Sequence, residues 1–189
     1  MKRLVQAGMI CAAVTAVTGT AQAQRRGAAT SAYTALDLER CTVSRSIPDE
    51  GASTEWRCPG YRGTSLWVAE DDLRFDIDAG IANADFETAS RFNSPGPRVE
   101  WRLRGGQPFA IIYRLVLSWN DLPKRTILGV ETIGRRGRPG CLVAWVAASA
   151  PNANAVARQQ ADQRAAGFRC GRDRPARIGD LENLIPVAD

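Results

Sequence analysis

Apolar and charged residues alternate along several stretches of the chain, which is the pattern of half-buried β-strands. The strictest alternation covers 72–78, where Leu73, Phe75 and Ile77 share one face and the residues between them are charged. Further strands are predicted in the second half, with short turns between them, over 98–104, 109–119, 126–133 and 141–147. Because short connections join antiparallel neighbours, this half predicts a four-stranded antiparallel meander.

After the last predicted strand, small and apolar residues recur at helical spacing. Pro151 and Asn152 suit the start of a helix, and Gly167 suits its end. The face expected to pack against the sheet contains Ala153, Val156, Ala157, Ala161, Ala165 and Phe168. Arg158 and Asp162 lie one turn apart and are expected to pair weakly on the exposed side. The sequence therefore predicts an α+β fold, mainly antiparallel β-sheet with one C-terminal α-helix.

The first residues have the features of an export signal. Lys2 and Arg3 precede an uncharged apolar stretch, and Ala21 and Ala23 are the small residues that a signal peptidase requires. The apolar stretch is shorter than the roughly 20 residues of a membrane span, so we expect cleavage between Ala23 and Gln24. Removing 23 of the 189 residues leaves 166, predicted to form a flexible tail over 24–32 and a single domain over 33–189. This domain is expected to be periplasmic or secreted, with no further transmembrane segment.

Cysteine usage fits an oxidising compartment. Cys11 lies in the predicted signal, which leaves four cysteines, an even count that predicts two disulfides. Of the three pairings we favour Cys41–Cys58 and Cys141–Cys170, because each closes a modest loop within one half of the chain. A four-thiolate zinc site is the alternative, although the chain has none of the close C-x-x-C pairs that such sites usually contain.

The chain contains no histidine, which removes several kinds of chemistry. Serine–histidine and cysteine–histidine catalysis are excluded, as are the usual zinc and copper sites. The net charge of +5 falls to about +3 once Lys2 and Arg3 leave with the signal, so nucleic-acid binding is not expected. We expect no metal, no cofactor and no catalytic residues.

Three clusters of side chains are candidates for a functional site. The exposed loop with Arg135, Arg136 and Arg138 could contact anionic groups, with Arg98, Arg102 and Arg104 extending a basic patch. Trp56, Tyr61 and Arg62, beside a cysteine, are suited to anchoring a partner. The acidic cluster contains Glu70, Asp71, Asp72, Asp76 and Asp78. The alternation predicts that its aspartates are solvated, although paired carboxylates can also cleave glycosidic bonds.

Two stretches carry a resemblance to known proteins. Residues 56–63 with 68–74, and 152–158 with 161–162 and 168–171, resemble a group of small exported alphaproteobacterial proteins with four cysteines. That resemblance covers most of the chain after the signal and implies export but no activity. The tryptophan, cysteine and glycine of 56–60 are similar to those of periplasmic lysozyme inhibitors, which are disulfide-bonded β-barrels. The predicted C-terminal helix departs from that second pattern.

We therefore expect a non-enzymatic periplasmic or secreted binding protein, associated with the cell envelope and stiffened by two disulfides. Its fitting partners are an anionic envelope component or another periplasmic protein. One alternative is a carboxylate-dependent hydrolase of cell-wall or glycan material. The other is a structural subunit of an envelope assembly.

Overall fold

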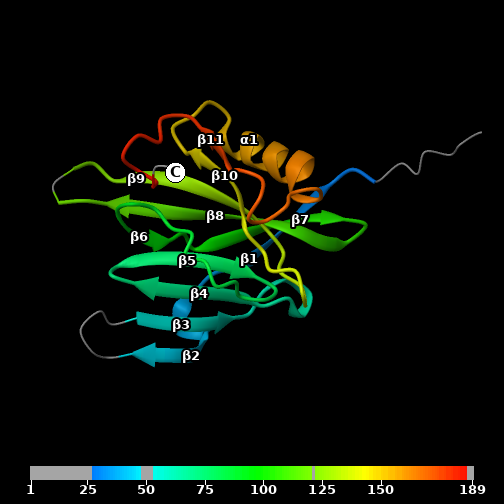
Figure 1. Ribbon diagram of the computed structural model, residues 1–189, viewed down its shortest axis with the longest axis horizontal. Helices are drawn as coiled ribbons and strands as arrows, with labels where there is room; N and C mark the ends of the chain where they lie inside the picture. The colour runs from blue at the N-terminus through cyan, green and yellow to red at the C-terminus, as the bar shows by residue number, and fades with distance from the viewer. Residues whose placement is uncertain (1–26, 48–52, 121, 187–189) are drawn as a thin grey trace, which may run out of the picture.

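The computed structural model describes residues 27–47, 53–120 and 122–186, which form two β-sheets and one helix (Figure 1). The predicted signal peptide and its cleavage site lie outside these residues. The strands are β1 (Thr30–Ala35), β2 (Thr42–Ile47), β3 (Ser53–Cys58), β4 (Leu66–Asp71), β5 (Arg74–Ala79), β6 (Phe92–Pro95), β7 (Arg98–Arg104), β8 (Gln107–Ser118), β9 (Arg125–Thr132), β10 (Leu142–Ala147) and β11 (Ala176–Ile178). Short 3-10 helices span Leu38–Arg40 and Tyr61–Gly63.

The larger sheet has seven strands, in the order β1-β7-β8-β9-β10-β11, with β6 also paired to β8. Its centre, β7 to β10, is the predicted antiparallel meander, which is confirmed. The 12-residue strand β8 is long enough for β7 to pair with its first half and β6 with its second half. Two strands at the rims were not predicted. The edge strand β1 begins at Thr30, inside the predicted flexible tail, and β11 pairs in parallel with β10.

The smaller sheet has four antiparallel strands in the order β2-β3-β4-β5. Figure 1 shows it below the larger sheet, with β5 as the strand nearest to it. The larger core cluster contains residues of both sheets, including Val68, Ile77, Trp101 and Tyr113. The two sheets therefore bury their apolar residues in one continuous core.

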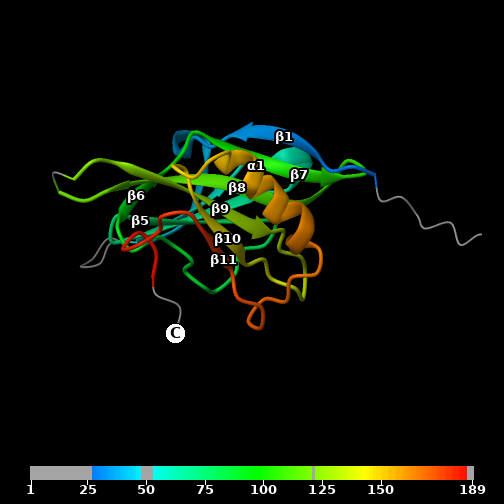
Figure 2. The same ribbon diagram turned by 90° about the horizontal axis from the view of Figure 1, so that it is seen from above.

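The predicted helix covers the other face of the larger sheet. It begins with α1 (Ala153–Gln160) and continues as a π-helical segment, Ala161–Ala165. Four alanines spaced four residues apart, with Phe168, pack against residues of β8, β9 and β10, as the periodicity predicted; they are Ala153, Ala157, Ala161 and Ala165. Figure 2 shows α1 lying across the strands of this sheet.

Arg158 and Asp162 do not form the predicted pair on the exposed side of the helix. Arg158 donates to Glu100, with Nε 2.6 Å from Oε1, and Asp162 binds Arg102, with Oδ2 2.7 Å from Nη2. Glu100 and Arg102 belong to β7 and are buried, so the charged side chains of the helix turn towards the sheet. The prediction was wrong because it considered the helix without the buried charges beneath it.

Both predicted disulfides are present. Cys41–Cys58 joins the end of the first 3-10 helix to β3, and Cys141–Cys170 joins the residue before β10 to the segment after the helix. The second bond ties the helical layer to the larger sheet, as expected from the positions of its cysteines. No helix among the described residues has the length and apolarity needed to cross a membrane.

Candidate functional site

Four acidic side chains meet where β5 approaches the larger sheet. Asp76 and Asp78 come from β5, Glu87 from the segment that follows it, and Glu131 from β9. Only 4% of Asp76, 6% of Asp78 and 1% of Glu131 is exposed to solvent. The prediction that these aspartates are solvated is therefore wrong. The segment after β5 and strand β9 lie against the face of β5 that alternation assigned to water.

Backbone and amide groups hold three of the four carboxyl groups. Ile77 N donates to Asp76 Oδ1 over 2.8 Å, and Leu142 N donates to Glu87 Oε2 over 2.7 Å. Asn83 donates twice to Asp78, from its backbone N to Oδ2 over 3.0 Å and from Nδ2 to Oδ1 over 2.6 Å. These bonds fix the carboxyl groups in place.

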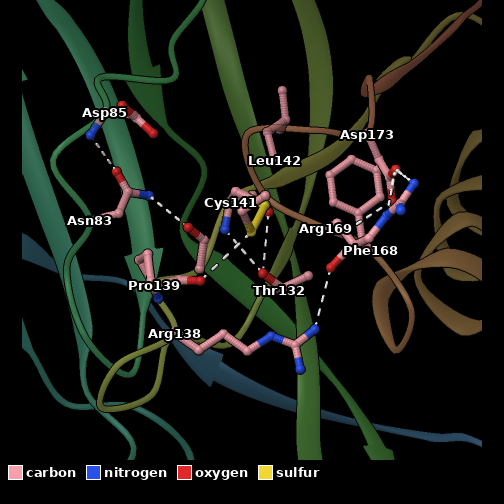
Figure 3. The surroundings of a disulfide bond; sticks show 12 residues. Asn83, Asp85, Thr132, Arg138, Pro139, Cys141, Leu142, Phe168, Arg169 and Asp173 are labelled. Carbon is pink, nitrogen blue, oxygen red and sulfur yellow. Dashed lines mark hydrogen bonds and ion pairs between the residues drawn. A yellow bond between two sulfur atoms is a disulfide. The ribbon is translucent and has the colours of Figure 1, made fainter.

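Asn83, which binds Asp78, also bonds to the loop that carries the second disulfide (Figure 3). Asn83 Nδ2 donates to the carbonyl oxygen of Gly140 over 3.3 Å, and Cys141 N donates to Thr132 Oγ1 over 3.0 Å. Leu142, which holds Glu87, is the next residue along the chain. The Cys141–Cys170 disulfide thus anchors the stretch of backbone that positions Asn83 and Glu87.

Burial makes the acidic cluster retain protons. It raises the pKa of Asp76 to about 8, with further contributions from the charges of Asp78 and Glu87. It likewise raises the pKa of Glu87 to about 7, and that of Glu131 well above its usual range. Burial also raises the pKa of Asp78, but its hydrogen bonds to Glu131 and Asn83 oppose that shift. At neutral pH the site therefore contains protonated carboxyl groups, Asp76 among them.

Two buried polar atoms beside the carboxyl groups have no hydrogen-bond partner among the described residues. They are Glu131 Oε1 and the hydroxyl oxygen of Tyr113, whose side chains are both 1% exposed. Gly129 lies opposite Tyr113 in the sheet, and a Cβ there would come within 2.4 Å of Tyr113 Cζ. The glycine leaves space for the ring, and the pair of unsatisfied oxygens marks this part of the core as polar.

A cleft of about 370 Å³ opens onto Asp76 and Asp78. Three aromatic residues, Trp56, Trp67 and Phe86, are among those that line it. Phe86 is 41% exposed, and Trp67 is held by a bond from its Nε1 to the carbonyl oxygen of Gly80 over 3.0 Å. The cleft therefore combines aromatic side chains with two carboxyl groups, the usual composition of a small-molecule site.

Of the residues predicted to bind a partner, the structure places only Trp56 at this cleft. Trp56 also stacks on Phe75, with ring centroids 6.3 Å apart. Tyr61 and Arg62 lie in the second 3-10 helix, where the Arg62 guanidinium carbon sits 5.4 Å from the centroid of the Tyr61 ring and Tyr61 packs against Trp101. The structure thus separates the Trp56 side chain from the other two.

The predicted arginine loop is a hairpin tip. Arg135 and Arg138 pair through their backbones, and these two and Arg136 are exposed, as expected. Arg138 Nη2 donates to the carbonyl oxygen of Phe168 over 3.3 Å. The wider basic patch is not formed as drawn from the sequence, because Arg102 is buried and bound to Asp162.

Sequence reasoning missed Asn83, Glu87 and Glu131. Glu131 carried a signal, since it is an acidic residue inside an otherwise uncharged predicted strand, 126–133. Asn83 and Glu87 lie in a stretch without periodicity. Among the described residues, no group of three or more cysteine, aspartate or glutamate side chains is arranged to hold a metal ion.

Comparisons with family models, curated proteins and solved structures found no match to this chain. The two resemblances drawn from the sequence therefore stay predictions, and only the geometry of the site bears on function.

Proposed function

We propose that this protein is an extracytoplasmic binding protein whose cleft takes an uncharged, hydroxyl-rich ligand, namely a glycan of the cell envelope. The observation that carries the proposal is the juxtaposition of Trp67 and Phe86 with the carboxyl groups of Asp76 and Asp78 in one cleft. The two disulfides and the predicted export signal support a location outside the cytoplasm, in the periplasm or secreted.

The protonation of the cleft favours a neutral ligand. A protonated carboxyl group has both a donor and acceptors, so Asp76 can bind a hydroxyl group in either direction. A cationic ligand would gain less from such a group than from a carboxylate. Aromatic side chains supply apolar area for the C–H faces of a sugar ring, with their edges free for polar contacts. The ring of Phe86 is exposed without a bound ligand and is available for this contact.

The test is to titrate the protein with chito-oligosaccharides and to measure binding by isothermal titration calorimetry. We expect saturable binding, weakened roughly 3- to 10-fold by Phe86→Ala, in line with the energy of one aromatic contact. Trp119→Ala is the matched control, because Trp119 is 42% exposed but packs on Phe92 and does not line the cleft. Equal losses in the two variants, or no binding by the wild type, would overturn the proposal.

One observation favours the hydrolase alternative as a second candidate. Burial raises the pKa of Asp76 to about 8, so it is an acid at neutral pH, and burial also raises the pKa of Asp78, although the two hydrogen bonds from Asn83 oppose that rise and favour the anionic form. An acid beside a carboxylate is the pair that glycoside hydrolysis requires. If it operates, the protein releases reducing ends from the same oligosaccharides, and Asp76→Asn abolishes that release while binding persists. Binding without release assigns the cleft to recognition alone.

A further inference from the structure

A second cavity, of about 560 Å³, lies between β10, residues 86–89 and the C-terminal segment around β11. Its apolar lining consists of Phe86, Ala89, Leu142, Trp145, Pro175 and Pro186. Leu142 and Trp145 are 5% and 4% exposed, so they form a fixed wall rooted in the core. Both the volume and the apolar wall are typical of a site for a small organic ligand.

Positive charge surrounds this cavity. Arg74, Arg174 and Arg177 line it, and Glu87 is the one acidic residue among the described lining residues. The carboxyl group of Glu87 accepts a hydrogen bond from Leu142 N. Because burial raises its pKa to about 7, Glu87 is about half protonated at that pH. The rim of the cavity therefore has a net positive charge.

Several guanidinium N–H groups of these arginines have no hydrogen-bond acceptor among the described residues. Arg74 binds Asp72 through Nη2, 3.1 Å from Oδ2, but its Nε is buried and has no partner. Arg177 uses Nη1 on the carbonyl oxygen of Pro186, and the Arg174 guanidinium makes no hydrogen bond or ion pair with the described side chains or backbone. A buried donor without an acceptor is costly, and an anion beside Arg74 would supply that acceptor.

We propose that this cavity binds a free amphiphile with one anionic head and an apolar chain, of the chemistry of a medium-chain fatty acid. The head group binds the arginines at the rim, and the chain lies on Leu142 and Trp145. Arginine suits this role because its planar guanidinium binds a carboxylate through two hydrogen bonds. The cavity shares Phe86 with the glycan cleft, but Arg74, Arg174 and Arg177 do not line that cleft, so the head-group contact is separate from glycan binding.

The test is a titration of the full chain with sodium dodecanoate below its critical micelle concentration. Calorimetry and tryptophan fluorescence report the binding. We expect one binding site, tighter for dodecanoate than for octanoate because the longer chain buries more apolar area. Dodecyltrimethylammonium, with the same chain and the opposite charge, is expected to bind at least about tenfold more weakly.

Arg174→Gln is the variant that tests the head-group contact, since Arg174 is exposed and its replacement leaves the core intact. We expect it to weaken dodecanoate binding about tenfold, the effect of one charge-assisted hydrogen bond. Arg172→Gln is the control, because Arg172 is also exposed but does not line the cavity. The proposal is overturned if both variants behave alike, if the cationic amphiphile binds equally well, or if only vesicles of anionic lipid bind. Glycan titrations do not involve these arginines, so the two proposals fail separately.

Discussion

Replacing Asp76 by asparagine tests the central electrostatic claim, that the acidic cluster stores protons because it is buried. Asparagine resembles the protonated aspartic acid in shape and keeps an oxygen to accept the hydrogen bond from Ile77 N. It removes one titrating group and little else. We therefore expect the variant to fold and to differ from the wild type mainly in how its stability depends on pH.

The sign and size follow from the pKa of Asp76, which burial raises from 3.8 to about 8. Between these values the folded state holds a proton that the unfolded chain has released, so the free energy of unfolding falls as the pH rises. The contribution of Asp76 is fully present below pH 4 and is lost by about pH 8. At about 1.4 kcal/mol per pKa unit, the loss from this group is on the order of 6 kcal/mol.

The assay is urea unfolding followed by circular dichroism at several pH values from 4.5 to 8.5. We expect wild-type stability to decline by several kcal/mol over this range and Asp76→Asn to remove the part of that decline that Asp76 contributes, while Glu87 and Glu131 maintain the rest. Asp72→Asn is the control, because Asp72 is an exposed carboxylate at the turn that precedes β5. If Asp76→Asn keeps the wild-type slope, or if Asp72→Asn flattens it equally, the buried cluster is not what stores the protons.

Three further changes probe the layers around the site. Ala157→Leu should lower stability by about 1–3 kcal/mol in thermal unfolding, because Ala157 is fully buried against the sheet, whereas Ala155→Leu on the exposed side should be nearly neutral. Glu100→Ala should cost roughly 3 kcal/mol by leaving Arg102 short of a buried partner, and the exposed Glu39→Ala should cost little; similar losses would refute this role. Replacing Cys141 and Cys170 together by serine should lower the free energy of unfolding by about 3 kcal/mol. It should also weaken glycan binding, because the disulfide anchors the backbone that holds Asn83 and Glu87. Unchanged binding would show that the disulfide does not position these two residues.

Periodicity predicted those parts of the fold in which one face of an element is apolar. The meander and the alanine face of the helix follow from patterns that a single stretch of sequence contains, and both disulfides belong to the favoured one of three possible pairings. The pairing of β1 with β7 could not be predicted in this way, because no pattern in residues 30–35 indicates a partner strand nearly seventy positions away.

The candidate site was predictable only in part, for a physical reason. Alternation in 72–78 assigns Asp76 and Asp78 to one face of β5, and it assigns that face to water because their side chains are charged. Their burial depends on β9 and on the segment that contains Asn83 and Glu87, which approach from elsewhere in the chain. Trp56 was predicted to anchor a partner, and the structure places it beside the cleft, whose lining residues also come from three other strands and the segment after β5.

The pairing of β1 with β7 has a consequence for how the chain reaches its native state. Strands β2 to β5 form consecutive hairpins, so each can pair as soon as it is made. Strand β1 precedes them all, yet its partner β7 comes after them. Whether the chain emerges during synthesis or during export, β1 has no partner until the smaller sheet and residues 98–104 have followed it, and closing such a long loop slows folding. Strand β1 is therefore expected to be among the last strands to pair, although it comes first in the sequence.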